Sequence, residues 1–210
     1  QPSPDDWLMF SRTYDAQRFS PLDQITTENV GQLALAWARG FGTGLTETVP
    51  LVYDGVMYLA APGGGVQALD ATTGDLVWEH ARELAGDQAV RQRTKSLAIY
   101  QDLLFYTAPD GYVVGLDART GKLRWEAPTG RDHTSGPLVV DGLVISGGAC
   151  MRDITPAPRP NCFIAAHDAL TGTERWRFYT TPAPGEPGDE TWYGVPLEKR
   201  RASPWGFQGS

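Results

Sequence analysis

A nine-residue pattern that occurs three times constrains the fold of this chain more than any other feature. The copies read DATTGDLVW (70–78), DARTGKLRW (117–125) and DALTGTERW (168–176). Their opening aspartates lie 47 and 51 residues apart, a period found in β-propeller blades and less often in helical repeats. Asp followed by Thr-Gly provides turn chemistry, because Asp bonds the backbone ahead of it and Gly accepts a positive φ. Each turn lies between two β-rich runs, so each copy predicts a β-hairpin.

A second hairpin precedes each copy of the pattern. The segments PLVYDGVMYLAA (50–61) and PLVVDGLVISGG (137–148) place Asp-Gly between two apolar runs, the strongest short hairpin signal. LAIYQDLLFYTA (97–108) has the same shape without the glycine. Each unit therefore predicts four short strands, and LALAW (33–37) is similar to the last strand of an earlier unit. We expect an all-β propeller of about four blades, with residues 1–210 forming one partial propeller domain.

A tryptophan closes each outer hairpin, where one large ring can fill the wedge between neighbouring blades. We expect this packing role for Trp37, Trp78, Trp125 and Trp176. Three to four blades are fewer than a closed ring of this kind uses, and open sheet edges invite association. The chain is therefore expected either to be part of a longer protein or to complete its ring with a second copy.

The composition and charge narrow the classes of function. The 210 residues carry a formal net charge of −7, which disfavours binding to the phosphate backbone of nucleic acids. No apolar run of about 18 residues is present, so no membrane-spanning helix is expected. The N-terminus lacks the basic and apolar regions of a signal peptide, which is therefore absent or removed. Cys150 and Cys162 lie in a Gly/Pro-rich loop, and their spacing fits two free thiols as well as a disulfide.

Segments outside the repeat resemble one known family, in the same order along the chain. DWLMFSRTYDAQRFSPLDQITTENVGQLALAW, TSGPLVVDGLVISGGAC, NCFIAAHDALTGTERWRFYTTPAPGEPGDETW and ASPWGFQGS are similar to quinoprotein alcohol dehydrogenases that use pyrroloquinoline quinone (PQQ). The resemblance implies an eight-bladed periplasmic propeller, of which this chain resembles the N-terminal half. It also implies PQQ and calcium on the central axis, hydride transfer from an alcohol to PQQ, and cytochrome c or a quinone as electron acceptor.

The resemblance also implies residues that contact PQQ, a flat quinone with three carboxylates. Trp205 matches the tryptophan that forms the floor under the cofactor, and Glu47 matches a glutamate that contacts it. Thr134 matches a threonine that bonds a PQQ carboxylate, a bond that the adjacent Ser135 could make instead. The alternatives are a core or loop tryptophan, a solvated carboxylate and a hydroxyl that only stabilises a turn.

Three further positions follow from the same resemblance. Lys95 stands where the family usually has an arginine, and lysine keeps the charge but loses the bidentate geometry. Arg93 could substitute for it, in which case Lys95 is an exposed loop cation. Gly148 and Ala149 match backbone that approaches the cofactor, where small residues let a ring lie close to the chain.

The chain also departs from the family pattern. Cys150 stands where many members have a glutamate that binds calcium, and a thiol is a poor ligand for this cation. The calcium ligands are therefore unknown. Some branches of the family carry a cysteine pair here, and this resemblance implies a disulfide between Cys150 and Cys162. Ala89 and Val90 replace the adjacent cysteines that often lie above PQQ. The family's catalytic base and calcium-binding asparagine would lie beyond Ser210, so no catalytic residue is assigned.

A non-catalytic propeller that scaffolds or binds other molecules is the second hypothesis. The cysteine at position 150 and the missing base favour it, whereas Trp205, Glu47 and Thr134 favour an enzyme, because a scaffold needs only the repeats. None of the three histidines is expected to act as the base, and His167 is expected to pack within its blade. We therefore predict a PQQ-dependent alcohol dehydrogenase whose isolated 210-residue chain is incomplete for catalysis.

Overall fold

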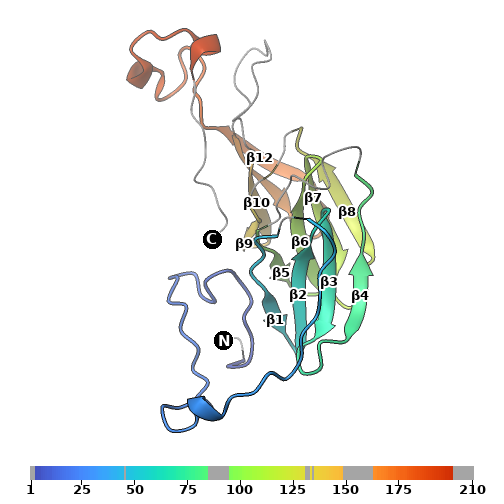
Figure 1. The fold of residues 1–210 in the computed structure, drawn as a ribbon. Coiled ribbons are helices and arrows are strands. Elements are labelled where there is room, and N and C mark those ends of the chain that lie inside the picture. Colours follow the sequence, from blue (N-terminus) through green and yellow to red (C-terminus); the bar gives the residue numbers. More distant parts are fainter. Residues whose placement is uncertain are drawn as a thin grey trace.

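The computed structural model describes residues 3–44, 46–84, 95–130, 133, 135–148 and 163–200. Within these ranges the chain forms three antiparallel sheets of four strands, ordered β1-β2-β3-β4, β5-β6-β7-β8 and β9-β10-β11-β12. The sheets stand side by side, with β1, β5 and β9 along one side of the molecule and β4 and β8 along the other (Figure 1). This architecture confirms the all-β fold and the four-stranded units that the repeat predicts.

The strand boundaries follow the repeat closely. The first sheet consists of β1 (Leu51–Tyr53), β2 (Val56–Ala61), β3 (Gly65–Asp70) and β4 (Leu76–His80). The second consists of β5 (Ala98–Tyr100), β6 (Leu103–Ala108), β7 (Tyr112–Asp117) and β8 (Leu123–Pro128). The third consists of β9 (Leu138–Val140), β10 (Leu143–Gly148), β11 (Phe163–Asp168) and β12 (Glu174–Tyr179). Short 3-10 helices are η1 (Val30–Gln32), η2 (Asp189–Trp192) and η3 (Leu197–Lys199). None of the helices in the described ranges is long and apolar enough to span a membrane.

The first hairpin of each sheet turns where the sequence predicts. Asp54 and Gly55 have φ values of 49° and 76°, and Asp141 and Gly142 have 48° and 73°. Two successive positive φ values are typical of the type I′ turn, whose twist matches that of paired strands. In the second sheet Gln101 takes the first of these positions, with a φ of 55°.

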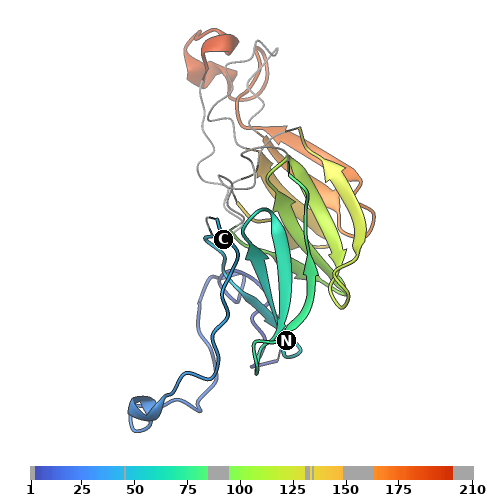
Figure 2. The ribbon, with the colours of Figure 1, turned by 45° about the vertical axis from the view of Figure 1, so that its right-hand side comes forward.

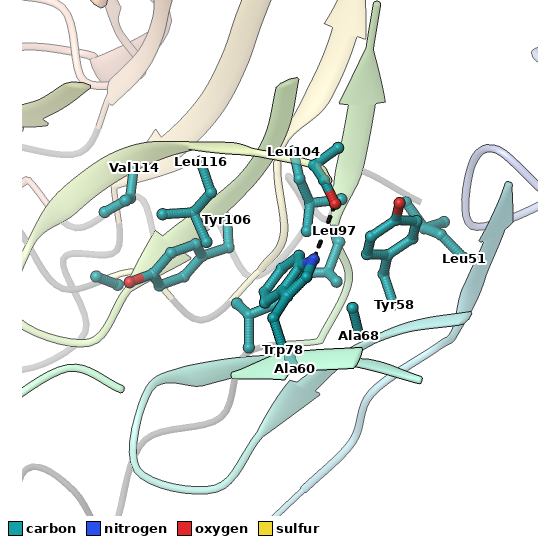
Figure 3. Packing of buried hydrophobic residues seen from close by; sticks show 13 residues of the cluster. Leu51, Tyr58, Ala60, Ala68, Trp78, Leu97, Leu104, Tyr106, Val114 and Leu116 are labelled. Carbon is teal, nitrogen blue, oxygen red and sulfur yellow. Dashed lines mark hydrogen bonds between the residues drawn. The ribbon is translucent and has the colours of Figure 1, made fainter. Parts of the chain in front are cut away.

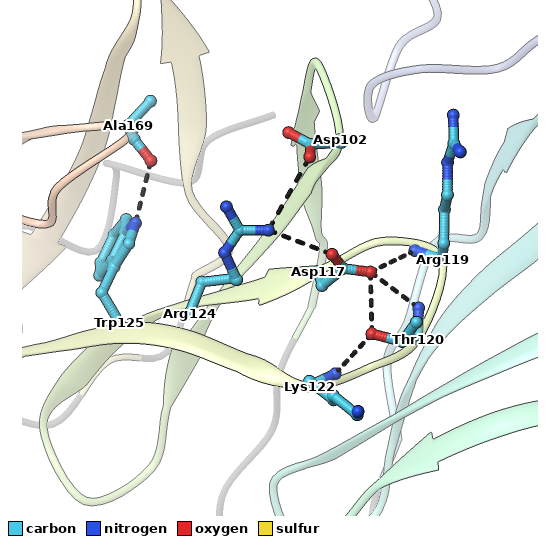
Figure 4. Close-up of polar contacts among 8 residues, drawn as sticks. All are labelled: Asp102, Asp117, Arg119, Thr120, Lys122, Arg124, Trp125 and Ala169. Carbon is cyan, nitrogen blue, oxygen red and sulfur yellow. Dashed lines mark hydrogen bonds and ion pairs between the residues drawn. The ribbon is translucent and has the colours of Figure 1, made fainter.

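The repeated Asp-Ala-x-Thr-Gly sequence closes the outer hairpin in all three sheets. Oδ1 of Asp117 accepts the backbone N–H groups of Arg119 and Thr120 at 3.1 and 2.9 Å (Figure 4). Asp70 and Asp168 accept the equivalent bonds in the other two sheets. The aspartate of the repeat therefore fixes the turn in each copy, as turn chemistry predicts.

The repeated tryptophans join each sheet to the next. Nε1 of Trp78 donates to the carbonyl of Ala118 at 3.0 Å (Figure 3), and Nε1 of Trp125 donates to the carbonyl of Ala169 at 2.9 Å (Figure 4). A Cβ atom at Gly121 would lie 2.4 Å from the Trp78 ring, so the ring rests directly on the glycine of the next turn. This contact confirms the predicted packing role and explains why glycine is needed in the turn.

Residues 33–37 do not form the strand that LALAW suggests. They are extended but pair with no strand in the described ranges, and a strand requires a neighbour for its backbone hydrogen bonds. Trp37 nevertheless donates to the carbonyl of Ala71 at 3.1 Å and packs on Gly74. This segment therefore makes the contact of a preceding outer strand without being part of a sheet.

Two hydrophobic clusters fill the spaces between the sheets. The first joins sheets one and two and includes Leu51, Tyr58, Trp78, Leu104 and Tyr106 (Figure 3). The second joins sheets two and three and includes Phe105, Val113, Val139, Val144 and Ala169. Since the second sheet buries both of its faces, the sheets stabilise one another as neighbouring repeats do.

The N-terminal segment lies outside the three sheets but is bonded to the first strand of two of them, β1 and β9. Trp7 forms an antiparallel bridge with Val52 in β1. The hydroxyl of Tyr14 donates to the carbonyl of Val139 in β9 at 2.7 Å. In both views the segment lies toward the end of the molecule opposite to η2 and η3 (Figures 1 and 2). The N-terminal segment therefore connects the first sheet to the third through β1 and β9.

The antiparallel order gives the three sheets two unlike ends. The Asp-Gly turns and the Asp-Ala-x-Thr-Gly turns lie at one end, which we call the turn end. At the opposite end, the linker end, β1, β5 and β9 begin and β2, β6 and β10 finish. The connections from β4 to β5 and from β8 to β9 also start and finish there.

Candidate functional site

Three of the predicted cofactor-binding residues lie in the described ranges, and all three lie at the linker end. Glu47 precedes β1, Lys95 precedes β5 and Gly148 ends β10. The other predicted positions lie outside the described residues: Thr134, Ala149 and Trp205, the cysteine pair Cys150 and Cys162, and also Ala89, Val90 and Arg93. Their roles stay predictions.

Glu47 and Lys95 form an ion pair that joins the starts of the first two sheets. Nζ of Lys95 lies 3.5 Å from Oε2 of Glu47, with side chains 26% and 40% exposed respectively. The backbone N–H of Val49 also donates to the carbonyl of Lys95 at 2.9 Å. Backbone and side chains thus hold together two positions that are 48 residues apart in the sequence. The pair offers a cation and a carboxylate, partly open to solvent, at the end where the cofactor is predicted.

His133 lies in the linker between β8 and β9 and is 2% exposed. Its Nδ1 lies 2.8 Å from the carbonyl of Gly147, and its Nε2 lies 2.7 Å from the hydroxyl of Thr129. Burial is the main cause that lowers the pKa of His133 to about 4, so the ring is neutral near pH 7. Both ring nitrogens are therefore engaged by groups of the protein, and the ring is enclosed by its surroundings.

Gly148 lies beneath the ring of Phe163 from the neighbouring strand β11. A Cβ atom at position 148 would approach the ring to 2.5 Å, so packing inside the sheet is enough to require glycine there. The guanidinium of Arg177 stacks on the same ring at 4.0 Å and bonds both carboxylate oxygens of Glu174 at 3.1 and 2.6 Å. The predicted contact of the Gly148 backbone with PQQ stays a prediction beside this structural explanation.

Arg82 forms a cluster at the linker end that the sequence analysis did not identify. Its Nε lies 2.8 Å from Oδ1 of Asp110, its Nη1 lies 2.9 Å from Oε2 of Glu126, and its guanidinium lies 4.8 Å from the Tyr112 ring centroid. Although burial opposes the charge, the bonds from the two carboxylates raise the pKa of Arg82. The cluster ties the chain after β4 to the second sheet.

The other two histidines, His80 and His167, are also partly or fully buried in the fold. His167 is 1% exposed, and its Nε2 lies 3.8 Å from Oε2 of Glu174 in the same sheet, which confirms that it packs within its blade. Burial is the main cause that lowers the pKa of both His80 and His167. His167 stands where the other copies have Leu69 and Leu116. A histidine at a position where the other two copies have leucine is the sequence feature that could have indicated a polar interface between the second and third sheets.

The described residues do not assemble a metal site by themselves. No group of three or more His, Cys, Asp or Glu residues in these ranges is placed to hold a metal ion. The charged groups at the predicted cofactor end are the ammonium of Lys95 and the carboxylate of Glu47, which pair with each other. A calcium ion would need further oxygen ligands than these described residues provide.

The repeated four-stranded sheets, docked to one another through tryptophan, define this protein as a β-propeller. The family model of the PQQ glucose/ethanol/alcohol dehydrogenase β-propeller domain matches residues 7–124 and 126–208. The chain belongs to this family, which confirms the resemblance seen in the sequence.

Individual relatives agree with this assignment. The chain is 36% identical to the quinohemoprotein alcohol dehydrogenase ADH-IIG of Pseudomonas putida, over 91% of this chain and 29% of that protein. It is also 36% identical to the dehydrogenase subunit of the quinone alcohol dehydrogenase of Gluconobacter oxydans, over 99% of this chain and 29% of the relative. The chain thus spans less than a third of the length of either relative.

A solved structure shows the same fold. The quinohemoprotein alcohol dehydrogenase from Comamonas testosteroni superposes with a TM-score of 0.74 at 31% identity, over 89% of this chain and 29% of that one. A europium-containing methanol dehydrogenase gives the same TM-score at 30% identity, over 86% of this chain and 33% of that one. Family and fold therefore agree between sequence and structure.

Proposed function

We propose that this chain is part of the cofactor-binding propeller of a PQQ-dependent alcohol dehydrogenase. The observation that carries the proposal is the Glu47–Lys95 pair, which brings two of the predicted PQQ contacts together at the linker end. The names of the relatives support alcohols as substrates, and the names of several include quinone or quinohemoprotein. The proposal includes calcium beside PQQ, electron transfer to cytochrome c or a quinone, and a periplasmic location.

The chain's own residues would bind and orient the cofactor. The ammonium group of Lys95 would hold a PQQ carboxylate, because charge-assisted hydrogen bonds are the strongest available at a partly exposed site. Glu47 would hold Lys95 in place, and Trp205 would stack under the flat ring system. When bound, PQQ supplies the two-electron oxidising power that no amino-acid side chain provides.

The proposal assigns cofactor binding to this chain and the remaining catalytic steps to residues outside the described ranges. Among the described residues, no group of three or more metal-ligating side chains is present, and His133 is engaged at both ring nitrogens. Proton removal from the alcohol and most of the calcium coordination would therefore be done by residues outside the described ranges. The single domain proposed for residues 1–210 would supply one side of the cofactor cradle.

A non-catalytic scaffold is the second candidate, and two observations favour it. Lys95 already has Glu47 as a partner, and Gly148 is already required by Phe163. These two residues therefore have structural explanations that need no cofactor. A scaffold of this kind would fold and dock its sheets as observed and would not bind PQQ.

Titration of the purified chain with PQQ in the presence of calcium, followed by tryptophan fluorescence, distinguishes the two candidates. We expect saturable quenching that is lost in Trp205→Ala. We expect Lys95→Met to weaken PQQ binding about tenfold or more, since charge-assisted bonds contribute roughly 1.5–3 kcal/mol. Lys122→Met is the matched control, because it removes an exposed lysine at the turn end and should leave the affinity unchanged.

The opposite results are equally clear. Absence of quenching by PQQ at high concentration would show that the chain alone does not bind the cofactor and would favour the scaffold. Equal weakening in Lys95→Met and Lys122→Met would show that only overall charge matters. Either result contradicts the assignment of Lys95 to the cofactor site.

A further inference from the structure

The linker between β8 and β9 contains a buried imidazole, that of His133, which bonds residues on both sides of it. Since a carbonyl oxygen can only accept, Nδ1 of His133 must carry the proton that it donates to Gly147. The neutral ring then accepts at Nε2, and the Thr129 hydroxyl is placed to donate to it at 2.7 Å. The Thr129 hydroxyl also lies 2.8 Å from the carbonyl of Gly111, which competes for its single proton. That carbonyl already accepts the backbone N–H of Thr129 at 2.8 Å, so it keeps a donor when the hydroxyl turns to His133. The tautomer of His133 is therefore fixed by its surroundings.

His133 thus connects two segments that each adjoin predicted PQQ contacts. One is the linker, in which His133 and Ser135 flank position 134. The other is the end of β10, where Gly147 precedes Gly148. Ser135 is 4% exposed, and its carbonyl accepts the Thr107 hydroxyl of β6. The linker is therefore fixed to the second sheet on one side, while His133 and the bond from Arg177 of β12 to the carbonyl of Thr129 at 3.2 Å reach the third.

The polar character of this interface is a departure from the repeat. The interface between the first two sheets places Tyr106 and Leu116 where the next interface places Ser146 and His167. Ser146 and His167 are at most 1% exposed, and Oγ of Ser146 and Nδ1 of His167 have no hydrogen-bond partner among the described residues. Buried polar groups are costly compared with apolar packing of the same shape. The first interface also buries a polar atom, the hydroxyl of Tyr106, so the second differs from it in carrying two polar side chains in place of an aromatic and an aliphatic one.

We propose that His133 is a positioning residue, which sets the spacing between the segment around position 134 and the end of β10 through its bonds to Thr129 and Gly147. This proposal deepens the proposed function and rests on it for the identity of the ligand. His133 itself touches no cofactor. Its effect on PQQ is transmitted through the two backbone segments that it joins.

Two substitutions separate positioning from packing. In His133→Asn the amide nitrogen takes the place of Nδ1 and keeps the donor to Gly147, whereas His133→Leu removes both bonds. His80→Leu is the control, because His80 is a partly buried histidine whose ring lies edge-on to Tyr106 in the other interface. Hydrogen exchange of backbone amides in the chain is measured first, because it needs no cofactor. PQQ affinity is measured second, by fluorescence quenching.

We expect His133→Leu to speed exchange about tenfold or more in residues 135–139 and 144–148, which corresponds to ~1.4 kcal/mol. His133→Asn should stay close to wild type, and His80→Leu should leave these segments unchanged. We also expect His133→Leu to weaken PQQ binding about tenfold, while His133→Asn retains most of the affinity.

The possible failures are distinguishable. Unchanged exchange in residues 135–148 of His133→Leu overturns the positioning role, whether or not PQQ binds. Faster exchange in all three sheets overturns it as well, since it shows a loss of global stability. Local loosening without any change in PQQ affinity contradicts the link to the cofactor. If wild-type chain binds no PQQ but His133→Leu still loosens locally, the proposed function fails and the structural tie remains.

Discussion

Burial of His133 makes the stability of the folded chain depend on acidity. Desolvation is the main cause that lowers the pKa from 6.5 to about 4, and His167 and Arg177 lower it further against the opposing bond to Gly147. The unfolded chain therefore binds a proton at this position more readily than the folded chain. Stability from the neutral ring is fully present above pH 6.5 and is lost as the pH falls toward 4.

We expect the free energy of unfolding to decrease between pH 6.5 and about 4 by up to ~3 kcal/mol from this residue alone, and to level off below that range. His133→Asn removes the titrating group, so its stability should fall less steeply over the same range. Urea denaturation at closely spaced pH values measures the difference. Parallel curves for the two proteins would contradict the assignment of the pH dependence to His133.

At the scale of the secondary-structure elements, the docking tryptophans provide a comparison within one chain. Trp78 is 9% exposed and donates to Ala118, whereas Trp176, at the same place in the repeat, is 42% exposed. In the part of the chain that the structure describes, Trp176 makes no such bond, because these ranges contain no further docking turn beyond β12. The two tryptophans share a sequence pattern and differ in what their rings cover.

We expect Trp78→Phe to destabilise the chain by about 2 kcal/mol, through the lost hydrogen bond and the smaller buried ring. Trp176→Phe should cost less than ~0.5 kcal/mol, as is usual for exposed positions. Urea unfolding of both variants under identical conditions tests this. A similar cost for both substitutions would show that Trp176 is docked on residues outside the described ranges.

The elements also show what could be predicted from the sequence. Local signals were sufficient for the hairpins, because Asp54-Gly55 and the Asp117 turn depend on neighbouring residues. Contacts between distant residues were not visible: the ring of Phe163 over Gly148 and the bond from Tyr14 to Val139 require the folded arrangement. Residues 33–37 failed as a strand because strand formation depends on a partner that the pattern itself does not provide.

The same distinction applies to the candidate site. The resemblance placed Glu47 and Lys95 at the cofactor, but the sequence alone did not show that they pair with each other. His133 was considered only as a possible base and was set aside. Its two bonds, to Thr129 and Gly147, depend on how the linker packs between two sheets. Such a role has no local sequence pattern.

At the scale of the whole molecule, the chain has more docking tryptophans than docking turns. The docking tryptophans are Trp37, Trp78, Trp125 and Trp176, but the repeat supplies three docking turns, and Trp37 already covers the first of them. The outer strand β12 also exposes Phe178 at 62%. Exposed apolar groups of this kind favour association. Trp176 of one copy can dock on the turn of Ala71 and Gly74 in a second copy only if Trp37 of that second copy does not already cover the turn.

We therefore expect Trp37→Ala to increase dimer formation by this chain, because it uncovers a docking turn for Trp176 of another copy. The double variant Trp37→Ala/Trp176→Ala should return to the wild-type mass distribution. Sedimentation at several protein concentrations measures the dimer fraction. If Trp37→Ala behaves as wild type, ring closure between two copies is not the way in which this edge is covered.

The bond from Tyr14 to Val139 joins residues that are 125 positions apart. This bond can form only after the third sheet has reached its final place, whereas Trp7 of the same segment pairs with Val52 of the first sheet. The hairpins, which have local contacts, can form in the order of translation. We therefore expect the N-terminal segment to attach to the first sheet before the third, with the Tyr14 bond among the late contacts of folding.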